Sequence, residues 1–482
     1  MRAPVAGILR VLLVAAAGAG LVQLSATNTV GLDVGSGASR PEEAATGQTL
    51  VSGAGLACSG AELTGIRGVR NIDQTVSIRA AVPPAALLPK APGKGSLQIA
   101  VGDAEATVTT RDETASARAN SAAAVTVSGS GGLAPGLAAD QSWVLDTATI
   151  RGLAATPCGR GLTDAWLVAG GGGVGRLERL VLANPSANPV TARVTVHGTS
   201  GLLTIDGQSV SVPAFGRTAL LVEALAPGEK APAVHVTASG AGLWPTLTDT
   251  WLDGLDPQGA DTTRAGAAPA RSQVIPGVVA DGDLTLRVLN PGEGEAVVSA
   301  AVVGPEGLVP IKGNAVARVN AGATAEIVVP GLTDGTYAVR VTADVPVVAA
   351  AMGGHRRGAG GEFAWAPSTV GTDGLAGAVL PTREGLTSTL ALVGGATPAQ
   401  VELTVVDGAT SRTRVLPIPA GATVAVPLAG AGSVWVRPLD DEPTVHAAVR
   451  LTLGAGADRL EAVLPLSPTV LTSALGQPTA VQ

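Results

Sequence analysis

The chain has 482 residues, of which 46% are hydrophobic and 14% are charged, and its formal net charge is -7. This hydrophobic share excludes a disordered chain, and the mild acidity argues against a protein that binds nucleic acid through a basic face. At a typical size of about 150 residues per domain, the length predicts three or four domains. Only 2% of the residues are aromatic, so the cores must be built from Val, Leu, Ile and Ala.

The N-terminus predicts a targeting segment over residues 1–32. Arg2 and Arg10 precede an apolar run from Val11 to Val22, which is shorter than the roughly 20 residues of a membrane-spanning helix. No charge interrupts the rest of the segment, so it is either a cleaved signal peptide or an uncleaved transmembrane anchor. Both alternatives place the remaining chain outside the cytoplasm, secreted or membrane-anchored. Small polar residues at 33–47 then predict a flexible stalk.

The middle of the chain repeats itself. A stretch from Leu180 to Val222 recurs without a gap from Leu286 to Val328, and each copy carries an Asn-Pro pair at the same place. A second marker, a strand of the AVxV type, occurs late in each of four units. Its anchor residues are Val127, Val236, Val341 and Val436. Repetition at this period predicts a tandem array, because each repeat is one structural unit.

Within a unit, apolar and polar residues alternate, as Val190 to Val196 illustrates. Alternation punctuated by glycine and proline predicts short antiparallel strands with one buried face. A unit of about 100 residues with about seven such strands has the size of an immunoglobulin-like β-sandwich. We therefore predict an all-β fold, a tandem array of about four immunoglobulin-like antiparallel β-sandwich units after an N-terminal apolar helix. The predicted units are 48–157, 158–272, 273–376 and 377–466, followed by a disordered tail at 467–482.

Cys58 and Cys158 are the two cysteines of the chain. An exported chain meets an oxidising compartment, so we predict a disulfide between them. The bridge closes a loop of about 100 residues, for which the chain-entropy model gives a stabilisation of up to about 4.7 kcal/mol.

The Asn184-Pro185 and Asn290-Pro291 pairs, the AVxV strands, and Cys158 followed by Trp166 resemble a family of exported actinobacterial proteins that carries a domain of unknown function. The resemblance extends over most of the chain from Cys58 onward. It implies a membrane-tethered protein of the cell envelope. It carries over no catalytic residue.

No constellation of residues predicts catalysis, a cofactor or a metal. The histidines do not pair at metal-ligand spacing, and His197 and His235 fall at strand positions that we expect to face outward. Gly170, Gly172 and Gly175 match G-x-G-x-x-G, but the segment that follows is strand-like, which predicts a hairpin loop rather than a dinucleotide site. No nucleophile elbow of the G-x-S-x-G type is present.

Three tryptophans, Trp143, Trp251 and Trp365, follow the last strand of the first three units. Aromatic rings can bind sugars as flat platforms. Their recurrence at one place in a chain poor in aromatic residues instead favours a plug that closes each core or joint.

Two other features could either bind a ligand or be ordinary solvent-exposed loops. His355, Arg356 and Arg357 form a basic tip that suits anionic glycans or lipid headgroups, or is simply a solvated hairpin. The acidic clusters suit calcium, although solvated loops explain them better. Their residues are Asp253, Asp256 and Asp261, and Asp440, Asp441 and Glu442.

Taken together, these features predict a non-enzymatic extracytoplasmic protein of the cell envelope, a tethered spacer or an interaction scaffold. We expect its partners to be envelope proteins or glycans, and we expect the N-terminal segment to attach it to the membrane. We expect no binding to nucleic acid. The alternative is a carbohydrate- or cell-wall-binding module that uses Trp251 or the basic tip at His355–Arg357. An enzyme acting through a scattered carboxylate pair is the third class.

Overall fold

A computed structural model of the chain describes residues 48–63, 72, 74–120, 123–203, 208–309, 311, 315–357, 360–440 and 445–474. These residues belong to one compact unit, Gln48–Gln482. The predicted targeting segment at 1–32 and the predicted stalk at 33–47 lie outside the described residues. Within the described part of the chain, no helix has the length and apolarity needed to cross a membrane.

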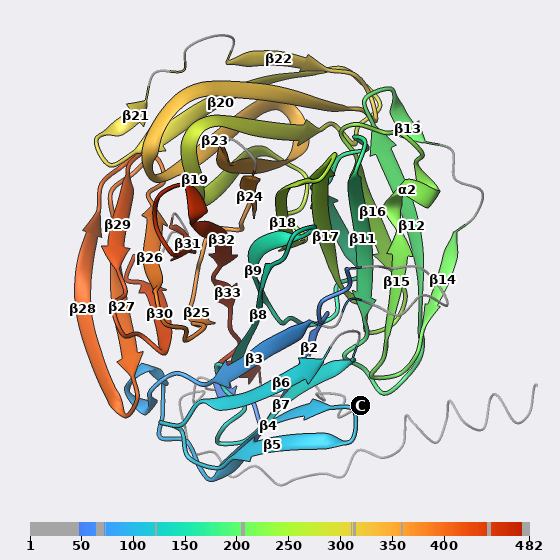
Figure 1. The fold of residues 1–482 in the computed structure, drawn as a ribbon. Coiled ribbons are helices and arrows are strands. Elements are labelled where there is room, and N and C mark those ends of the chain that lie inside the picture. Colours follow the sequence, from blue (N-terminus) through green and yellow to red (C-terminus); the bar gives the residue numbers. More distant parts are fainter. Residues whose placement is uncertain are drawn as a thin grey trace, which may run out of the picture. The chain divides into compact units, whose positions relative to one another are not determined.

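The described chain is all-β, as the alternation predicts, and its strands fall into four consecutive sheet groups (Figure 1). Sheet group 1 consists of two four-stranded sheets. In sheet order, the first contains β2 (Gly53–Cys58), β7 (Val125–Gly131), β4 (Gly95–Val101) and β5 (Ala104–Val108). The second contains β6 (Ala115–Asn120), β3 (Thr75–Ala81), β8 (Ala138–Asp146) and β9 (Arg151–Pro157).

Sheet group 2 also has two sheets. The first contains β10 (Asp164–Val168), β16 (Ala233–Ala238), β12 (Val190–Gly198) and β13 (Gly201–Leu203), with β14 (Ser209–Val212) also paired to β12. The second contains β15 (Arg217–Leu221), β11 (Arg176–Ala183), β17 (Trp244–Asp253) and β18 (Asp256–Arg264). Short helical turns are η1 (Ala85–Leu87), α2 (Val222–Leu225) and η2 (Gly456–Asp458).

Sheet group 3 is one six-stranded sheet built on two long strands. Its strands are β19 (Ala270–Leu289), β23 (Thr324–Arg357), β20 (Ala296–Gly304), β21 (Gly307–Val309), β22 (Val316–Val319) and β24 (Gly360–Pro367). Leu286 of β19 lies opposite both Ile327 and Ala351 of β23. Strand β23 therefore flanks this part of β19 on both sides.

Sheet group 4 again has two sheets. The first contains β28 (Thr410–Ile418), β27 (Ala399–Asp407), β30 (Ser433–Pro438), β25 (Ala376–Val379) and β33 (Ser467–Pro468). The second contains β29 (Thr423–Pro427), β26 (Leu386–Val393), β31 (His446–Leu453) and β32 (Leu460–Pro465). The immunoglobulin-like character of each sheet group stays a prediction. The predicted unit boundaries also stay predictions.

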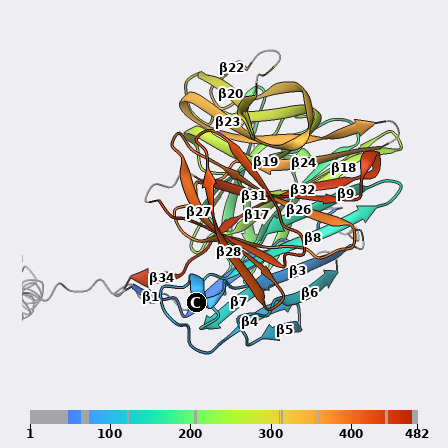
Figure 2. The ribbon, with the colours of Figure 1, turned by 90° about the vertical axis from the view of Figure 1, so that its left-hand side faces the viewer.

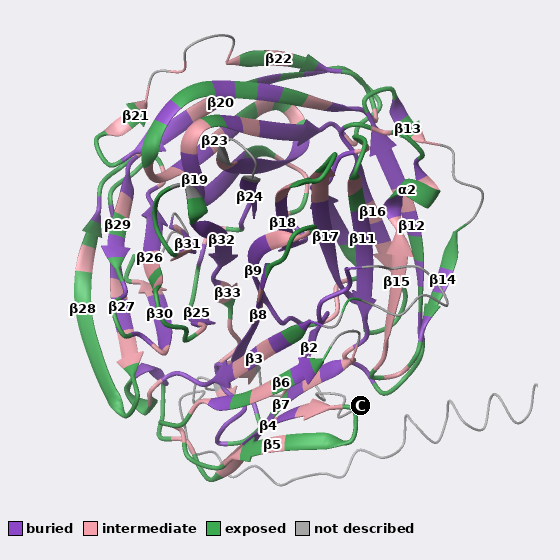
Figure 3. Ribbon diagram, viewed as in Figure 1, coloured by how far each residue is buried: buried purple, intermediate pink, exposed green. Residues whose placement is uncertain are grey.

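In sheet groups 1, 2 and 4, the last strand of the second sheet lies at the edge of that sheet, as does the last strand of sheet group 3. We call these strands, β9, β18, β24 and β32, the closing strands. They lie towards the middle of Figure 1 and contact one another in a cycle, β9 to β18 to β24 to β32 and back to β9. They are largely buried (Figure 3). Edge strands present unpaired backbone groups, so their convergence protects four edges at once.

Each closing strand places side chains in the core of a neighbouring group, because successive side chains of a strand point in opposite directions. In β24, Ala364 packs in the core of sheet group 3, whereas Phe363 and Trp365 pack in that of sheet group 2. The other three strands repeat this exchange. Ala260 enters the core of sheet group 1, Val463 that of group 3, and Leu153 and Ala155 that of group 4. Groups 2, 3 and 4 thus each contribute side chains to the core of the preceding group, and group 1 contributes side chains to the core of group 4.

The two ends of the unit pair with each other. Strand β1 (Gln48–Leu50) is antiparallel to β34 (Thr472–Ala474), and the N–H of Val51 donates to the carbonyl of Leu471 at 3.1 Å (Figure 2). We predicted a disordered tail at 467–482. The described part of that segment contains β33 and β34, because it finds strand partners in β25 and β1. Residues 475–482 lie outside the described residues.

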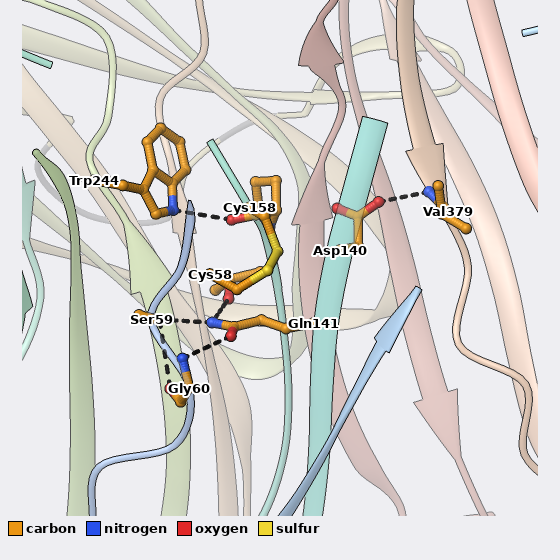
Figure 4. The surroundings of a disulfide bond; sticks show 10 residues. Cys58, Ser59, Gly60, Asp140, Gln141, Cys158, Trp244 and Val379 are labelled. Atoms are coloured by element: carbon orange, nitrogen blue, oxygen red, sulfur yellow. Dashed lines mark hydrogen bonds between the residues drawn. A yellow bond between two sulfur atoms is a disulfide. The ribbon is translucent and has the colours of Figure 1, made fainter. Parts of the chain in front are cut away.

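The predicted disulfide is present between Cys58 and Cys158, with 4.4 Å between their Cα atoms (Figure 4). It joins the end of β2 to the residue that follows the closing strand β9. Beside it, the side-chain amide of Gln141 donates a hydrogen bond to the Ser59 hydroxyl at 2.6 Å. The Trp244 indole N–H donates one to the Pro157 carbonyl at 3.1 Å. Because Trp244 belongs to sheet group 2, the bridge stands where the first two groups meet.

Candidate functional site

Buried carboxyl groups join the sheet groups where the closing strands meet. Asp140 of β8 accepts a hydrogen bond from the N–H of Val379 in sheet group 4 at 2.5 Å (Figure 4). Asp261 of β18 accepts one from the N–H of Trp365 in sheet group 3 at 2.7 Å. A buried backbone N–H needs an acceptor, and these carboxylates supply it where no strand partner is available.

Glu362 of β24 makes the same kind of bond to two other groups. Its Oε1 accepts from the N–H of Leu153 at 3.4 Å and from the N–H of Glu461 at 3.3 Å. Its Oε2 is buried without a hydrogen-bond partner among the described residues. An ionised oxygen in that position would be costly, which favours the protonated carboxyl.

Burial raises the pKa of these acids. The pKa of Asp140 rises to about 8, against the opposing effects of the Val379 N–H and the Arg264 charge. The pKa of Asp261 rises to about 7, and that of Glu362 lies well above its ordinary value, in both cases mainly because burial disfavours the charge. A carboxyl with a raised pKa is also what a general acid requires, so access to a ligand decides its role.

A hollow of about 510 Å³ lies next to Glu362 and is also lined by Asp283, Met352 and Phe363. Glu362 is only 1% exposed. On β24 it shares a strand face with Ala364, which packs inward, whereas Phe363 points to the opposite face. Its Oε1 is engaged by the N–H groups of Leu153 and Glu461, and almost none of the residue is open to solvent, so the arrangement suits a structural acid better than a catalytic one.

An ionic network joins sheet groups 2 and 3. Arg176 donates to Asp249, with Nε 2.9 Å from Oδ1, and the Trp365 indole N–H donates to Asp249 Oδ2 at 2.9 Å. The Arg176 guanidinium also lies 5.3 Å from the centre of the Trp251 ring. Buried charges need such partners to be tolerated.

A second arginine extends this network. Arg287, which is buried, pairs with Glu326 at 2.7 Å and lies 5.0 Å from the centre of the Trp365 ring. Burial, followed by the nearby Asp249 charge, raises the pKa of Glu178 to about 7. Its Oε1 accepts the N–H of Gly171 at 2.6 Å. The network therefore fixes the contact between sheet groups 2 and 3.

The three tryptophans do not share a groove. Trp143 is buried in the core of sheet group 1, and Trp365 is buried in that of sheet group 2, as the plug interpretation predicts. Trp251 is half-buried at the edge of the group 2 core, where Arg176 covers one face of its ring. Trp143 and Trp365 are therefore not exposed platforms for a sugar, whereas a ligand contact at Trp251 stays a prediction.

The basic tip belongs to the hairpin formed by β23 and β24. The backbone partners of His355, Arg356 and Arg357 are Glu362, Gly361 and Gly360. The side chains of the three basic residues lie outside the described residues.

His197 lies on the outward face of its strand, as the alternation predicts, but it is buried rather than exposed to solvent. It points away from the core of its own sheet, but the next sheet group covers that face, and Gly322 contributes a carbonyl oxygen 2.8 Å from Nδ1. His235 stacks on Trp166, with 3.6 Å between ring centres. Periodicity identifies the face of a strand but not whether another unit covers it.

The described residues of the acidic clusters do not come together in a cation site. Asp253 and Asp256 are exposed opposite each other at a turn, whereas Asp261 is buried elsewhere on β18. Asp440 accepts the N–H of Gln400 at 2.7 Å, while Asp441 and Glu442 lie outside the described residues. Among the residues that the structure describes, no three His, Cys, Asp or Glu side chains are placed to hold a metal ion.

Sequence reasoning missed the buried acids and arginines. The available signal was a charged residue inside an apolar strand, such as Glu362 in GEFAWAP or Glu461 in LEAVLP. A charge in a strand that is apolar on both faces indicates a buried pair or a buried neutral acid, because an isolated buried charge is too costly.

These features define an all-β protein whose sheet groups exchange strands around a buried, hydrogen-bonded centre. Residues 108–429 match the model of a family of unknown function, DUF5719, and the chain belongs to that family. The predicted membership of a family with a domain of unknown function is confirmed, whereas export and actinobacterial origin stay predictions. No curated protein matches the chain.

Proposed function

We propose that this protein is a non-enzymatic interaction scaffold of the cell envelope, placed outside the cytoplasm by its segment 1–32. The observation that carries the proposal is the pairing of β1 with β34, which brings both ends of the unit into one ladder. A spacer protein needs its two chain ends to lie far apart, whereas a closed unit with adjacent ends presents one rigid surface to its partners. This favours the scaffold over the spacer.

The joints support the same proposal. Core residues exchanged between neighbouring groups, a disulfide, and ion pairs such as Arg217–Glu62 and Arg459–Asp281 all oppose relative motion of the groups. A rigid surface binds partners with less loss of conformational entropy. The carbohydrate-binding alternative loses support at Trp251, because the Arg176 guanidinium covers one face of that ring.

Protease treatment of intact source cells tests the location. We expect the full-length protein to be degraded in intact cells, and a variant without residues 2–32 to be protected until the cells are lysed. A full-length protein that remains protected in intact cells would contradict the proposal.

Crosslinking of the full-length protein in its envelope tests the scaffold role. We expect reproducible crosslinks to defined envelope proteins that survive Trp251→Ala and disappear with Trp365→Ala, which loosens a joint. Crosslinks that are indifferent to Trp365→Ala would show that the closed unit is not what partners recognise.

A further inference from the structure

Two hollows meet at the segment 381–386 of sheet group 4, and we call them together the joint groove. The first, of about 460 Å³, lies between the outer face of the β6-β3-β8-β9 sheet and the segment 381–386. The second, of about 430 Å³, lies within sheet group 4 and is lined by the same segment, β26 and residues 427–431. The hollows share Pro381, Thr382, Arg383 and Leu386.

One wall of the joint groove is a row of polar side chains. Ser77 of β3 lies opposite Arg118 of β6 on one side and Ser142 of β8 on the other. The neighbouring residues Val76 and Trp143 pack in the core of sheet group 1. Because side chains alternate along a strand, the row faces outward into the groove.

The opposite wall is held in place by the buried centre. The segment that carries Thr382 and Arg383 begins beside Val379, whose N–H is bound by Asp140, and Leu380, whose carbonyl accepts from Arg79. Both anchors come from sheet group 1, so the two walls are fixed to each other.

The joint groove is electropositive in an acidic protein. Arg118 and Arg383 are both exposed, and neither guanidinium group has a hydrogen-bond or ion-pair partner among the described residues. No described carboxylate lines either hollow. Some other arginines of the described chain, such as Arg176 and Arg287, are engaged by acids and are not free to bind a ligand. Two unpaired guanidinium groups in one groove therefore suit an anionic ligand.

The remaining lining identifies the kind of anion. The hydroxyls of Ser77, Ser142, Thr382 and Thr389 have no hydrogen-bond partner among the described residues, and they can bond to ligand hydroxyls. Leu153 and Leu386 add apolar surface for the C–H faces of sugar rings. No exposed aromatic ring lines the groove as a stacking platform for bases, which single-stranded nucleic acids require.

We propose that the joint groove binds an anionic glycan, a chain of hydroxyl-rich sugar units that carries carboxylate or phosphate groups. The arginines would bind the anionic groups, and the row of hydroxyls would bind the sugar. This site is distinct from Trp251 and from the basic tip, and it goes beyond the scaffold proposal, since it does not require a protein partner.

Titration calorimetry of the purified full chain with three probes tests the site. The probes are a galacturonic acid hexamer, a glycerol phosphate hexamer and a neutral maltohexaose. We expect saturable binding of at least one anionic probe, much weaker binding of the neutral one, and weakening by salt. Binding of the uronate or the phosphate probe alone identifies the anionic group. Equal binding of the neutral probe, or no saturable binding, overturns the proposal.

The double variant Arg118→Ala, Arg383→Ala identifies the groove. We expect its affinity for the anionic probe to fall at least about tenfold, since each lost bond to a charged group is worth more than about 1.4 kcal/mol. The matched control is Arg412→Ala, Arg414→Ala, which removes the same charge from exposed positions of β28. An equal loss in the control, or no loss in the groove variant, overturns the site. Unchanged circular dichroism shows that both variants are folded, and an intact crosslinking pattern keeps this test separate from that of the scaffold.

Discussion

Asp140, Asp261 and Glu362 show how single residues stabilise the meeting point of the sheet groups. Each accepts a backbone N–H from a different group, and burial raises the pKa of each. A carboxyl protonates more readily in the folded state when its folded pKa exceeds its unfolded pKa. Its favourable contribution is therefore complete below the unfolded pKa and is lost as the pH rises towards the folded pKa.

Asp140→Asn tests this linkage. The pKa of Asp140 is about 8, against an ordinary value of 3.8, so the free energy of unfolding should fall between about pH 4 and pH 8. Asparagine keeps an acceptor for the Val379 N–H and does not ionise. We expect the variant to have a flatter profile and to exceed the wild type at pH 8 by a few kcal/mol, on the order of 1.4 per pKa unit. Urea unfolding from pH 4 to 9 measures this, and parallel profiles would refute it.

The elements show which parts of the fold could be predicted from the sequence. Strands such as β12, which reads Val190-Thr-Ala-Arg-Val, have one buried face, so their alternation predicts them directly. The cysteine pair predicted the disulfide because an exported chain with two cysteines offers one pairing. The closing strands could not be assigned in this way. Both faces of β24 are apolar, because Phe363 and Trp365 lie on one face and Ala364 lies on the other. This pattern indicates that both faces are buried, but it does not indicate which sheet group covers each face.

The same limit applies to the joint groove. Sequence reasoning can place Ser77, Arg118 and Ser142 on outward strand positions. It cannot place them in one row, because the cross-strand register depends on pairings between strands that are distant in the chain. Nor can it show that Arg383 lies across from that row, since this follows from closure of the fourth group onto the first.

Trp365→Ala tests the exchange of closing strands. The ring is 1% exposed, lies in the core of sheet group 2 and donates to the buried Asp249. We expect a loss of about 3–5 kcal/mol in the free energy of unfolding, because the change leaves a cavity and removes a donor. Trp251→Ala is the matched control, and its half-buried ring should cost markedly less. Thermal and urea unfolding compare the two, and equal losses would contradict the exchange.

In the whole unit, the four sheet groups form a closed arrangement rather than an open row, because the first group contacts the fourth. A tandem array that stays open exposes its first and last units, which then need capping surfaces. Here the closing strand of the first group fills the core of the fourth, and β34 pairs with β1. The repeats predict four similar pieces, but closure depends on the angle between neighbours, which the repeat pattern does not encode.

The double variant Thr49→Cys, Ser473→Cys tests closure directly. These residues are cross-strand partners in the β1–β34 ladder, so under mild oxidation we expect an intramolecular disulfide in the folded monomer. Thr49→Cys with Thr410→Cys, at the exposed start of β28, is the control that should not crosslink. Peptide mapping of the unreduced monomer identifies the bridge. In an open row of four units the first and last strands would be far too distant to bond, so crosslinking found between molecules alone would show that the array does not close.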